Sequence, residues 1–205
     1  MIKRTSKSFI EKTLSLNPDW NVLDIGCGHN ANKYANVICD IQNLSEEYKD
    51  KKFVQLNEKK LPFKDNEFDY VISSHVMEHV EDLSFFISEL ERISSKGYIE
   101  LPTKLEDNLV FENKNDHIWQ MDFDDVQNKL IINERIQYLE PVLTVSSIKK
   151  FNEFFRKSLV LELEWNQDID HIFITIDKKS YTKTTIRSLV RKYFSKKIRT
   201  LIRKK

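Results

Sequence analysis

Hydrophobic residues in this chain occur more often in short continuous runs than in strict alternation with polar ones. Five such runs lie in the first half of the chain, at residues 20–28, 35–41, 52–56, 68–74 and 97–101. Continuous apolar runs of this length are typical of strands that are buried on both faces of a parallel sheet. We therefore expect five strands, most of them parallel.

Apolar residues three and four positions apart predict helices over residues 5–17, 81–95 and 146–157. Two later apolar runs, at 159–165 and 171–177, predict a closing β-hairpin. Residues 103–144 are less regular, and within them the stretch 129–143 predicts a hairpin or irregular β-structure. Strands that alternate with helices indicate an α/β fold.

Glycine is rare in this chain, which has only three, and two of them stand close together. Gly26 and Gly28 follow the first predicted strand directly. Glycine is needed where φ is positive or where a ligand approaches the backbone closely. Asp24 precedes the pair, and Asp40 ends the second predicted strand, where a carboxylate can accept both hydroxyl groups of a ribose. Open α/β sheets bind ligands at this edge, so we expect a nucleotide-like ligand there.

Two nucleotide ligands compete for this motif. A dinucleotide site requires G-x-G-x-x-G/A, a helix N-terminus at the pyrophosphate and an acidic residue about 20 positions further on. Ala31 can fill the third position, but the step from Gly28 to Asp40 is too short to hold a crossover helix. S-adenosylmethionine (SAM) has a sulfonium and a ribose but no phosphate, and it suits Asp24 and Asp40. The spacing therefore favours SAM.

With these residues in place, the sequence resembles the class I SAM-dependent methyltransferases of the type 11 kind. The resemblance covers residues 20–102 and is carried by VLDIGCG (22–28), ICDI (38–41), LPFKDNEFDYVISSHVMEHVED (61–82) and KGYIELP (96–102). It implies a Rossmann-like, seven-stranded, mostly parallel sheet with helices on both faces and an antiparallel last strand. The run 159–177 would supply strands six and seven.

The resemblance also implies roles for particular residues. Asp24, Gly26 and Gly28 would line the methionine part of SAM, and Asp40 would bind the ribose. Asn57 lies where the family often has an acidic residue near the adenine amine. Ser73 and Ser74 end the fourth predicted strand, beside the expected site of methyl transfer.

A subgroup of bacterial surface-glycan and small-molecule methyltransferases shares the short connection after the glycines and has an H-x-W sequence after strand five. Here that sequence is His117-Ile118-Trp119. His117 is accordingly our candidate for a general base that takes a proton from the acceptor. His75 lies nearer the strand end and is a second candidate. Alternatively, His117 packs against Trp119 and has a structural role only.

Residues 75–79 also read as H-x-x-E-H, the signature of an inverted zinc peptidase. A peptidase would need both histidines on one helix face and a third ligand downstream. The motif instead adjoins a predicted strand, and a peptidase leaves the glycine motif unexplained. We therefore expect Glu78 and His79 to cap and order the start of the next helix, and we assign no metal ligands.

Charge is unevenly distributed along the chain. Residues 178–205 contain 12 Lys or Arg and no Asp or Glu, whereas the chain as a whole is nearly neutral at +1. Apolar residues from Ile186 to Ile202 recur every three or four positions and form one helical face. We expect a methyltransferase domain at 1–178, with a substrate-side insertion at 103–158, and a basic amphipathic helix at 179–205. This helix binds an anionic membrane surface, packs on the body of the protein or, less favoured, binds nucleic acid.

Taken together, the sequence predicts an enzyme that transfers a methyl group from SAM to a hydroxyl of a glycan or small-molecule precursor. A non-catalytic SAM-binding or scaffold protein and an RNA-directed methyltransferase remain alternatives. No apolar run approaches the ~18 residues that a membrane span requires, and we see no secretory signal. We expect a cytoplasmic protein with reduced Cys27 and Cys39, associated through its tail with the inner face of the membrane.

Overall fold

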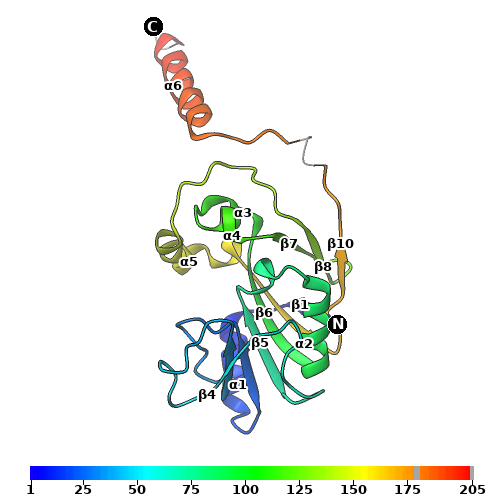
Figure 1. The fold of residues 1–205 in the computed structure, drawn as a ribbon. Helices are drawn as coiled ribbons and strands as arrows, with labels where there is room; N and C mark the ends of the chain where they lie inside the picture. Colours follow the sequence, from blue (N-terminus) through cyan, green and yellow to red (C-terminus); the bar gives the residue numbers. More distant parts are fainter. Residues whose placement is uncertain (178–180, 204–205) are drawn as a thin grey trace.

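The computed structural model describes residues 1–177 and 181–203, and its centre is a seven-stranded sheet (Figure 1). The strand order is β1-β9-β6-β5-β2-β3-β4. The five runs expected to be strands all lie in this sheet and pair in parallel with one another. They are β2 (Val22–Ile25), β3 (Val37–Asp40), β4 (Lys52–Gln55), β5 (Tyr70–Ser74) and β6 (Lys96–Pro102). This confirms the predicted mostly parallel sheet.

The remaining two strands of the sheet come from opposite ends of the chain. β9 (Val160–Asn166) pairs antiparallel with β6, as the resemblance implied for one late strand. Beyond it lies β1 (Ile2–Arg4), antiparallel to β9 and therefore parallel to the other five. The predicted hairpin of 159–165 and 171–177 is thus wrong, because the edge position belongs to β1. Ile2 is fully buried there, but a three-residue strand with one apolar residue leaves no pattern to detect.

The second half of the predicted hairpin joins a separate three-stranded sheet. Here β7 (Trp119–Asp124) and β8 (Lys129–Glu134) form an antiparallel hairpin, and β10 (His171–Phe173) adds to β8 in parallel. The expected β-structure within 103–144 is therefore present, but residues 129–134 pair with the segment before them. The antiparallel partner is β7, in which the neighbouring residues Gln120 and Met121 are both buried.

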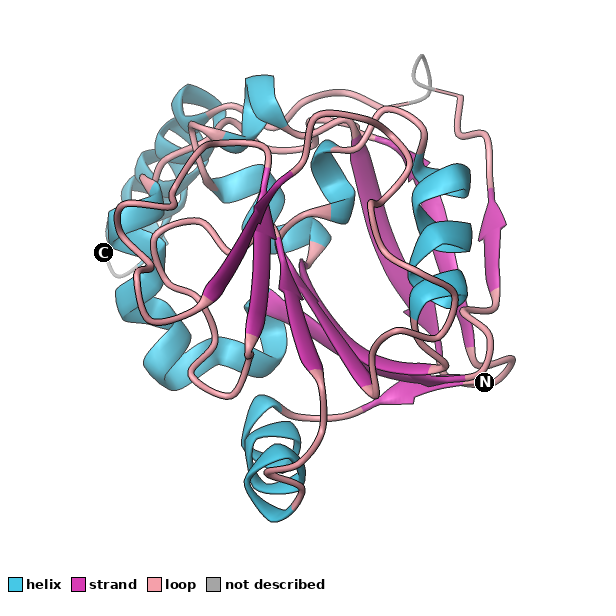
Figure 2. Cartoon of the chain, turned by 60° about the horizontal axis from the view of Figure 1, so that its bottom comes forward, coloured by secondary structure: helices cyan, strands magenta, loops and turns pink. Residues whose placement is uncertain are grey.

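Helices cover both faces of the large sheet, as expected (Figure 2). On one face, α1 (Lys7–Leu16) packs Ile10 and Leu14 into a cluster with side chains of β2, β3 and β5. On the other face, α2 (Leu83–Ile93) packs its apolar stripe against the alternate side chains of the same strands. Successive side chains of a strand point to opposite faces, so continuous apolar strands require a cover on each side.

The connection from β2 to β3 contains no helix, as its length predicted. The loop is held instead by side chains from elsewhere. The backbone N–H of Asn32 donates to Asp24 Oδ2 over 2.7 Å, and the N–H of Ala31 donates to the Tyr48 hydroxyl over 3.0 Å. These bonds satisfy loop amides that a crossover helix would otherwise pair internally.

Three helices and one short turn surround the carboxyl ends of the strands. The helices α3 (Lys104–Leu109) and α4 (Asn113–Asp116) follow β6, and α5 (Val145–Leu159) leads into β9. A 3-10 turn, η1 (Met77–His79), lies between β5 and α2. This arrangement places residues 103–158 beside the edge of the sheet where ligands bind in α/β folds.

The C-terminal helix α6 (Ile186–Arg203) extends away from the body of the protein (Figure 1, red). The apolar residues on its predicted face are exposed, and they include Leu189, Tyr193, Phe194 and Ile198. The side chains of Leu201 and Ile202, and the predicted boundary at 178/179, lie outside the described residues. Within the described ranges, the helices are too short or too polar to cross a membrane.

Candidate functional site

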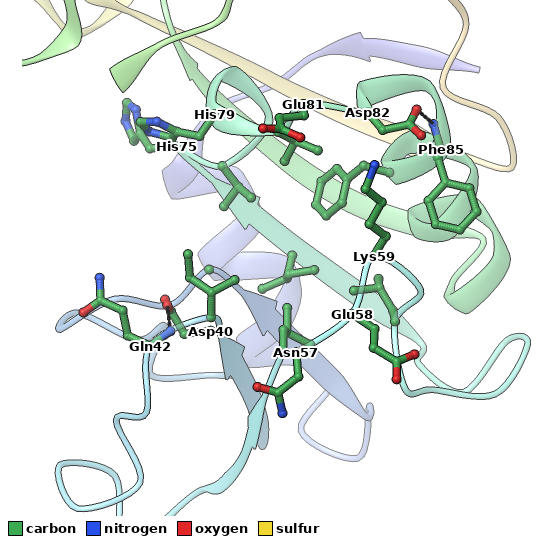
Figure 3. A pocket seen from close by; sticks show the side chains of 18 residues that line it. Asp40, Gln42, Asn57, Glu58, Lys59, His75, His79, Glu81, Asp82 and Phe85 are labelled. Atoms are coloured by element: carbon green, nitrogen blue, oxygen red, sulfur yellow. Dashed lines mark hydrogen bonds between the residues drawn. The ribbon is translucent and has the colours of Figure 1, made fainter. Parts of the chain in front are cut away.

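A cleft of about 680 Å³ opens at the carboxyl ends of the parallel strands (Figure 3). Four of its lining residues each follow or end a different strand: Gly26 after β2, Asp40 at the end of β3, Asn57 after β4 and His75 after β5. The remaining wall comes from η1 and the start of α2, including His79, Asp82 and Phe85. The volume is typical of a site for a small molecule or cofactor.

The backbone after β2 adopts the left-handed conformation that the two glycines allow. Gly26 has a φ of 67° and Gly28 a φ of 50°. A Cβ at Gly26 would lie 2.4 Å from Cγ2 of Val76, whereas a Cβ at Gly28 would meet nothing within 4 Å. Gly26 is therefore needed both for its φ and for the close packing of the turn after β2 against the segment after β5.

Asp40 is held in place by the backbone of two loops. Its Oδ2 accepts the N–H of Gly28 and its Oδ1 accepts the N–H of Gln42, both over 2.9 Å. The side chain is only 7% exposed, yet it lines the cleft on the same wall as Asn57 (Figure 3). Each carboxylate oxygen keeps a further lone pair for a ligand hydroxyl. The geometry suits the ribose-binding role predicted for Asp40.

Asp24, Gly28, Ser73 and Ser74 do not line the cleft. Asp24 is 4% exposed, and burial raises the pKa of its carboxyl to about 6 although the N–H of Asn32 favours the charge. Its position supports the loop after β2. The Ser73 hydroxyl is buried and finds no hydrogen-bond partner among the described residues, while Ser74 is partly buried.

His75 stands on the opposite wall, between two carboxylates. Its φ is 55°, and its ring nitrogens lie 3.3 Å from Glu78 Oε1 and 3.5 Å from Glu100 Oε1. Burial opposes the charge, but the two carboxylates prevail and raise the pKa of His75 to about 10. When His75 carries its proton, each ring N–H faces one of these two carboxylates.

His117 does not line the cleft but lies directly behind its wall. Its side chain is 6% exposed, and Nδ1 lies 2.7 Å from Oδ1 of Asp107. The ring packs edge-on against His79, with 4.7 Å between ring centroids. Asp107 also accepts from Arg135 Nε over 3.0 Å. The predicted candidate base is therefore part of a buried charged network that reaches the cleft through His79.

The H-x-W segment is joined to η1 along its length. The N–H of Ile118 donates to the carbonyl of Glu78, and Nε1 of Trp119 donates to the carbonyl of Val80, both over 2.8 Å. The H-x-x-E-H motif and the H-x-W segment, which lie nearly 40 residues apart in the chain, thus form one structure beside the cleft.

Glu78 and His79 do not cap the next helix, and that expectation is wrong. Asp82 is the N-cap of α2, and its Oδ1 accepts the N–H of Phe85 over 3.3 Å. The two residues lie on η1, one turn earlier, because the chain must first cross the edge of the sheet. The two histidines of H-x-x-E-H also do not share a helix, since His75 precedes η1.

Sequence reasoning missed four buried charged residues of this region: Glu100, Glu106, Asp107 and Arg135. Glu100 is held between His75 and Arg156, which lower its pKa to about 2 against the effect of burial. Burial raises the pKa of Glu106 to about 7. The one available signal was the acidic pair at 106–107 directly after β6, at the edge where sites form.

Comparison with known proteins agrees with this geometry. Residues 23–99 match the family described as "Methyltransferase domain". The match confirms, for this part of the chain, the resemblance to methyltransferases. It spans the strands that form the cofactor wall of the cleft, from β2 into β6.

One curated relative and two solved structures illustrate the likeness. The uncharacterized protein MJ0638 of Methanocaldococcus jannaschii is 37% identical to this chain over 113 residues. The match covers 51% of this chain and 50% of MJ0638, so the chain spans about half the length of that protein. A SAM-dependent methyltransferase of Aquifex aeolicus has 13% identity and a TM-score of 0.44 over 77% of this chain and 87% of its own. The PH0226 protein of Pyrococcus horikoshii has 17% identity and a TM-score of 0.43, covering 79% and 92%.

Proposed function

We propose that this chain binds SAM in the cleft and transfers its methyl group to a hydroxyl of a glycan or small-molecule precursor. One observation carries the cofactor part of the proposal. Gly26, Asp40 and Asn57 follow three adjacent strands and line one wall of a single cleft. Asp40 would accept the ribose hydroxyls, and Gly26 leaves the backbone open to the methionine part.

The reaction is an in-line displacement at the methyl carbon. The acceptor oxygen forms a bond to carbon as the sulfur–carbon bond breaks, which leaves S-adenosylhomocysteine, and the hydroxyl proton passes to solvent water. Most of the acceleration comes from holding the two reactants close and aligned. Val76, Phe85 and Phe86 give the cleft an apolar wall, which would help to exclude water from a bound cofactor.

The cofactor site is tested by calorimetric titration of S-adenosylhomocysteine into the wild type and Asp40→Ala. We expect micromolar binding by the wild type and at least about tenfold weaker binding by the variant, because each lost charge-assisted hydrogen bond is worth more than a neutral one. Asp125→Ala is the matched control, since Asp125 is exposed and pairs with Arg4 at the surface, away from the cleft. A folded wild type that binds no ligand would favour the scaffold alternative.

The acceptor is tested with SAM that carries a labelled methyl group. A panel would contain sugars, nucleotide sugars, small hydroxyl compounds and short RNA. Label on a sugar or small-molecule hydroxyl supports the proposal. Label on RNA, with an affinity that falls steeply with salt, supports the RNA-directed alternative instead.

The exposed apolar face of α6 supports a second part of the proposal, that this helix binds an anionic membrane surface. Its lysines and arginines lie beside an apolar face that contains Tyr193 and Phe194, both more than half exposed. Such a face suits a lipid interface better than contacts to phosphate alone. Deletion of 180–205 should release the protein from anionic liposomes without loss of S-adenosylhomocysteine binding. Equal liposome binding by both forms would contradict it.

A further inference from the structure

Three side chains that commonly bind metals converge at the wall of the cleft. Glu78, His79 and His117 each offer one ligand atom, and these atoms all lie within 4.8 Å of one another. Glu78 and His79 come from η1, and His117 comes from the segment after α4. The hydrogen bond from the N–H of Ile118 to the carbonyl of Glu78 holds the two segments together.

In His79 and His117, the ring nitrogen Nδ1 already contacts an oxygen atom. Nδ1 of His117 lies 2.7 Å from Asp107 Oδ1, and Nδ1 of His79 lies 2.9 Å from the carbonyl oxygen of Asp116. A carbonyl oxygen can only accept, so His79 carries its proton on Nδ1. The carboxylate of Asp107 selects the same tautomer for His117. Both rings therefore keep a lone pair on Nε2, which is how metal-binding histidines are normally oriented.

Glu78 provides an independent sign of a missing ligand. Its side chain is 1% exposed, and its Oε2 has no hydrogen-bond partner in the described part of the chain. Oε1 faces His75, so only Oε2 is left without a contact. A buried carboxylate oxygen with no partner is costly, and a cation beside it removes that cost.

We propose that Oε2 of Glu78 and Nε2 of His79 and His117 bind one divalent transition-metal ion. Two imidazoles and one carboxylate suit Zn²⁺, Mn²⁺ or Fe²⁺ better than Mg²⁺ or Ca²⁺, which prefer oxygen ligands alone. Three protein ligands leave coordination positions open. His79 also lines the cleft, so the ion lies next to the space where the acceptor enters.

The ion also has a role that rests on the proposed methyl transfer. A metal-bound hydroxyl has a lowered pKa, so the ion would activate the acceptor oxygen in place of a histidine base. His117 is then a metal ligand, and Asp107 is a positioning residue that holds its ring.

The test begins with metal titration of the full chain after removal of metals with a chelator. Calorimetry with ZnCl₂ or MnCl₂ alone should show one ion per chain, and MgCl₂ should bind at least about tenfold more weakly. His117→Ala and Glu78→Gln should each weaken the binding of zinc at least about tenfold. Asp107→Asn should weaken it about 10–100-fold, as substitutions behind a metal ligand do.

His171→Ala is the matched control, because His171 Nδ1 also contacts a carbonyl oxygen, that of Ile169, but lies on β10 outside the cluster. This variant should bind the metal as the wild type does. Co²⁺ provides a spectroscopic check, since its visible absorption bands should appear with the wild type and be lost with Glu78→Gln, which keeps the shape of the side chain.

A folded wild type that binds neither Zn²⁺ nor Mn²⁺ would overturn the proposal, as would equal weakening by His171→Ala. Titration of the same metal-free protein with S-adenosylhomocysteine keeps the two proposals separate. Cofactor binding without metal binding removes only the metal site. Metal binding without cofactor binding removes only the methyltransferase.

Discussion

The two ends of the cleft are built in different ways. At the cofactor end, Gly26 and Asp40 lie 14 positions apart in the chain, and Asp40 is positioned by backbone N–H groups. At the other end, η1 meets the end of α4 and the segment after it. Behind this wall, ion pairs join the buried side chains of Asp107, His117 and Arg135. One end is defined by backbone conformation and the other by a buried charge network.

Because of this difference, we expect ligand affinity to depend mainly on the cofactor end and folding stability mainly on the charged end. At the cofactor end, the position of Asp40 depends on the conformation of the loop after β2. A substitution in this loop should therefore affect ligand affinity. Buried charges at the other end depend on their partners, so the loss of one partner should affect folding first. The predictions below test whether the two ends respond separately.

The largest effect is expected at the charged end, from Arg135→Met. Arg135 and Asp107 are both almost fully buried, and removal of one partner leaves the other charge buried. The free energy of unfolding should fall by about 3–5 kcal/mol in urea titrations. The dissociation constant for S-adenosylhomocysteine should stay within about threefold of the wild-type value.

The exposed pair of Arg4 and Asp125 provides the control for this substitution. Arg4→Met should leave the free energy of unfolding nearly unchanged, because exposed ion pairs contribute little. Equal destabilisation by both variants would show that burial does not distinguish the two pairs.

A smaller effect is expected from Asp24, a buried residue at the cofactor end whose carboxyl has a raised pKa. The pKa of Asp24 is about 6 in the folded state against an ordinary value of 3.8. The folded protein therefore binds this proton more tightly, so Asp24 contributes stability below pH 3.8 that is lost as pH rises through 6. The stability of the wild type relative to Asp24→Asn should fall by about 2 kcal/mol from pH ~4.5 to pH ~7.5.

Urea titrations of both proteins across this range measure the difference directly. Parallel curves for the wild type and Asp24→Asn would mean that Asp24 is ionised in the folded protein at the lower pH.

The next effect concerns ligand affinity at the cofactor end. Gly26→Ala places a methyl group 2.4 Å from Val76 Cγ2 and strains a backbone whose φ is 67°. Binding of S-adenosylhomocysteine should weaken at least about tenfold, which corresponds to ~1.4 kcal/mol. In a Val76→Ala background the collision is removed, and only the strain of the positive φ should remain, measured as a loss of about 1–2 kcal/mol in the free energy of unfolding. Unchanged affinity in the single variant would place the ligand away from this loop.

The smallest effect is expected at Asn57, which lines the cleft where the resemblance suggests an acidic residue. Asn57→Asp supplies a charged acceptor for the adenine amine and should tighten binding by up to about tenfold. Asn66→Asp is a suitable control, because Asn66 lies in a turn outside the cleft. Weaker binding by Asn57→Asp would indicate that the adenine does not reach this wall.

Much of the cofactor end was predictable because its signals are local. Continuous apolar runs identified β2 to β6, and the rare glycines marked the turn beside which Asp40 lies. The charged end was only partly predictable. His117 and H-x-x-E-H were both visible in the sequence, but nothing in their spacing indicated that His117 packs against His79. The burial of Glu106 and Asp107 was also hidden, since acidic residues on a short helix usually face solvent.

By itself, the sequence predicted the five parallel strands and the turn after β2, because continuous apolar runs and two closely spaced glycines are local signals. The tertiary structure alone decided that Ile2–Arg4, and not the run after 171, completes the sheet. It also decided that η1 meets the H-x-W segment to form the metal-binding cluster that we propose. These outcomes depend on which segments far apart in the sequence pack together. That packing depends on how the whole chain buries its apolar and charged side chains.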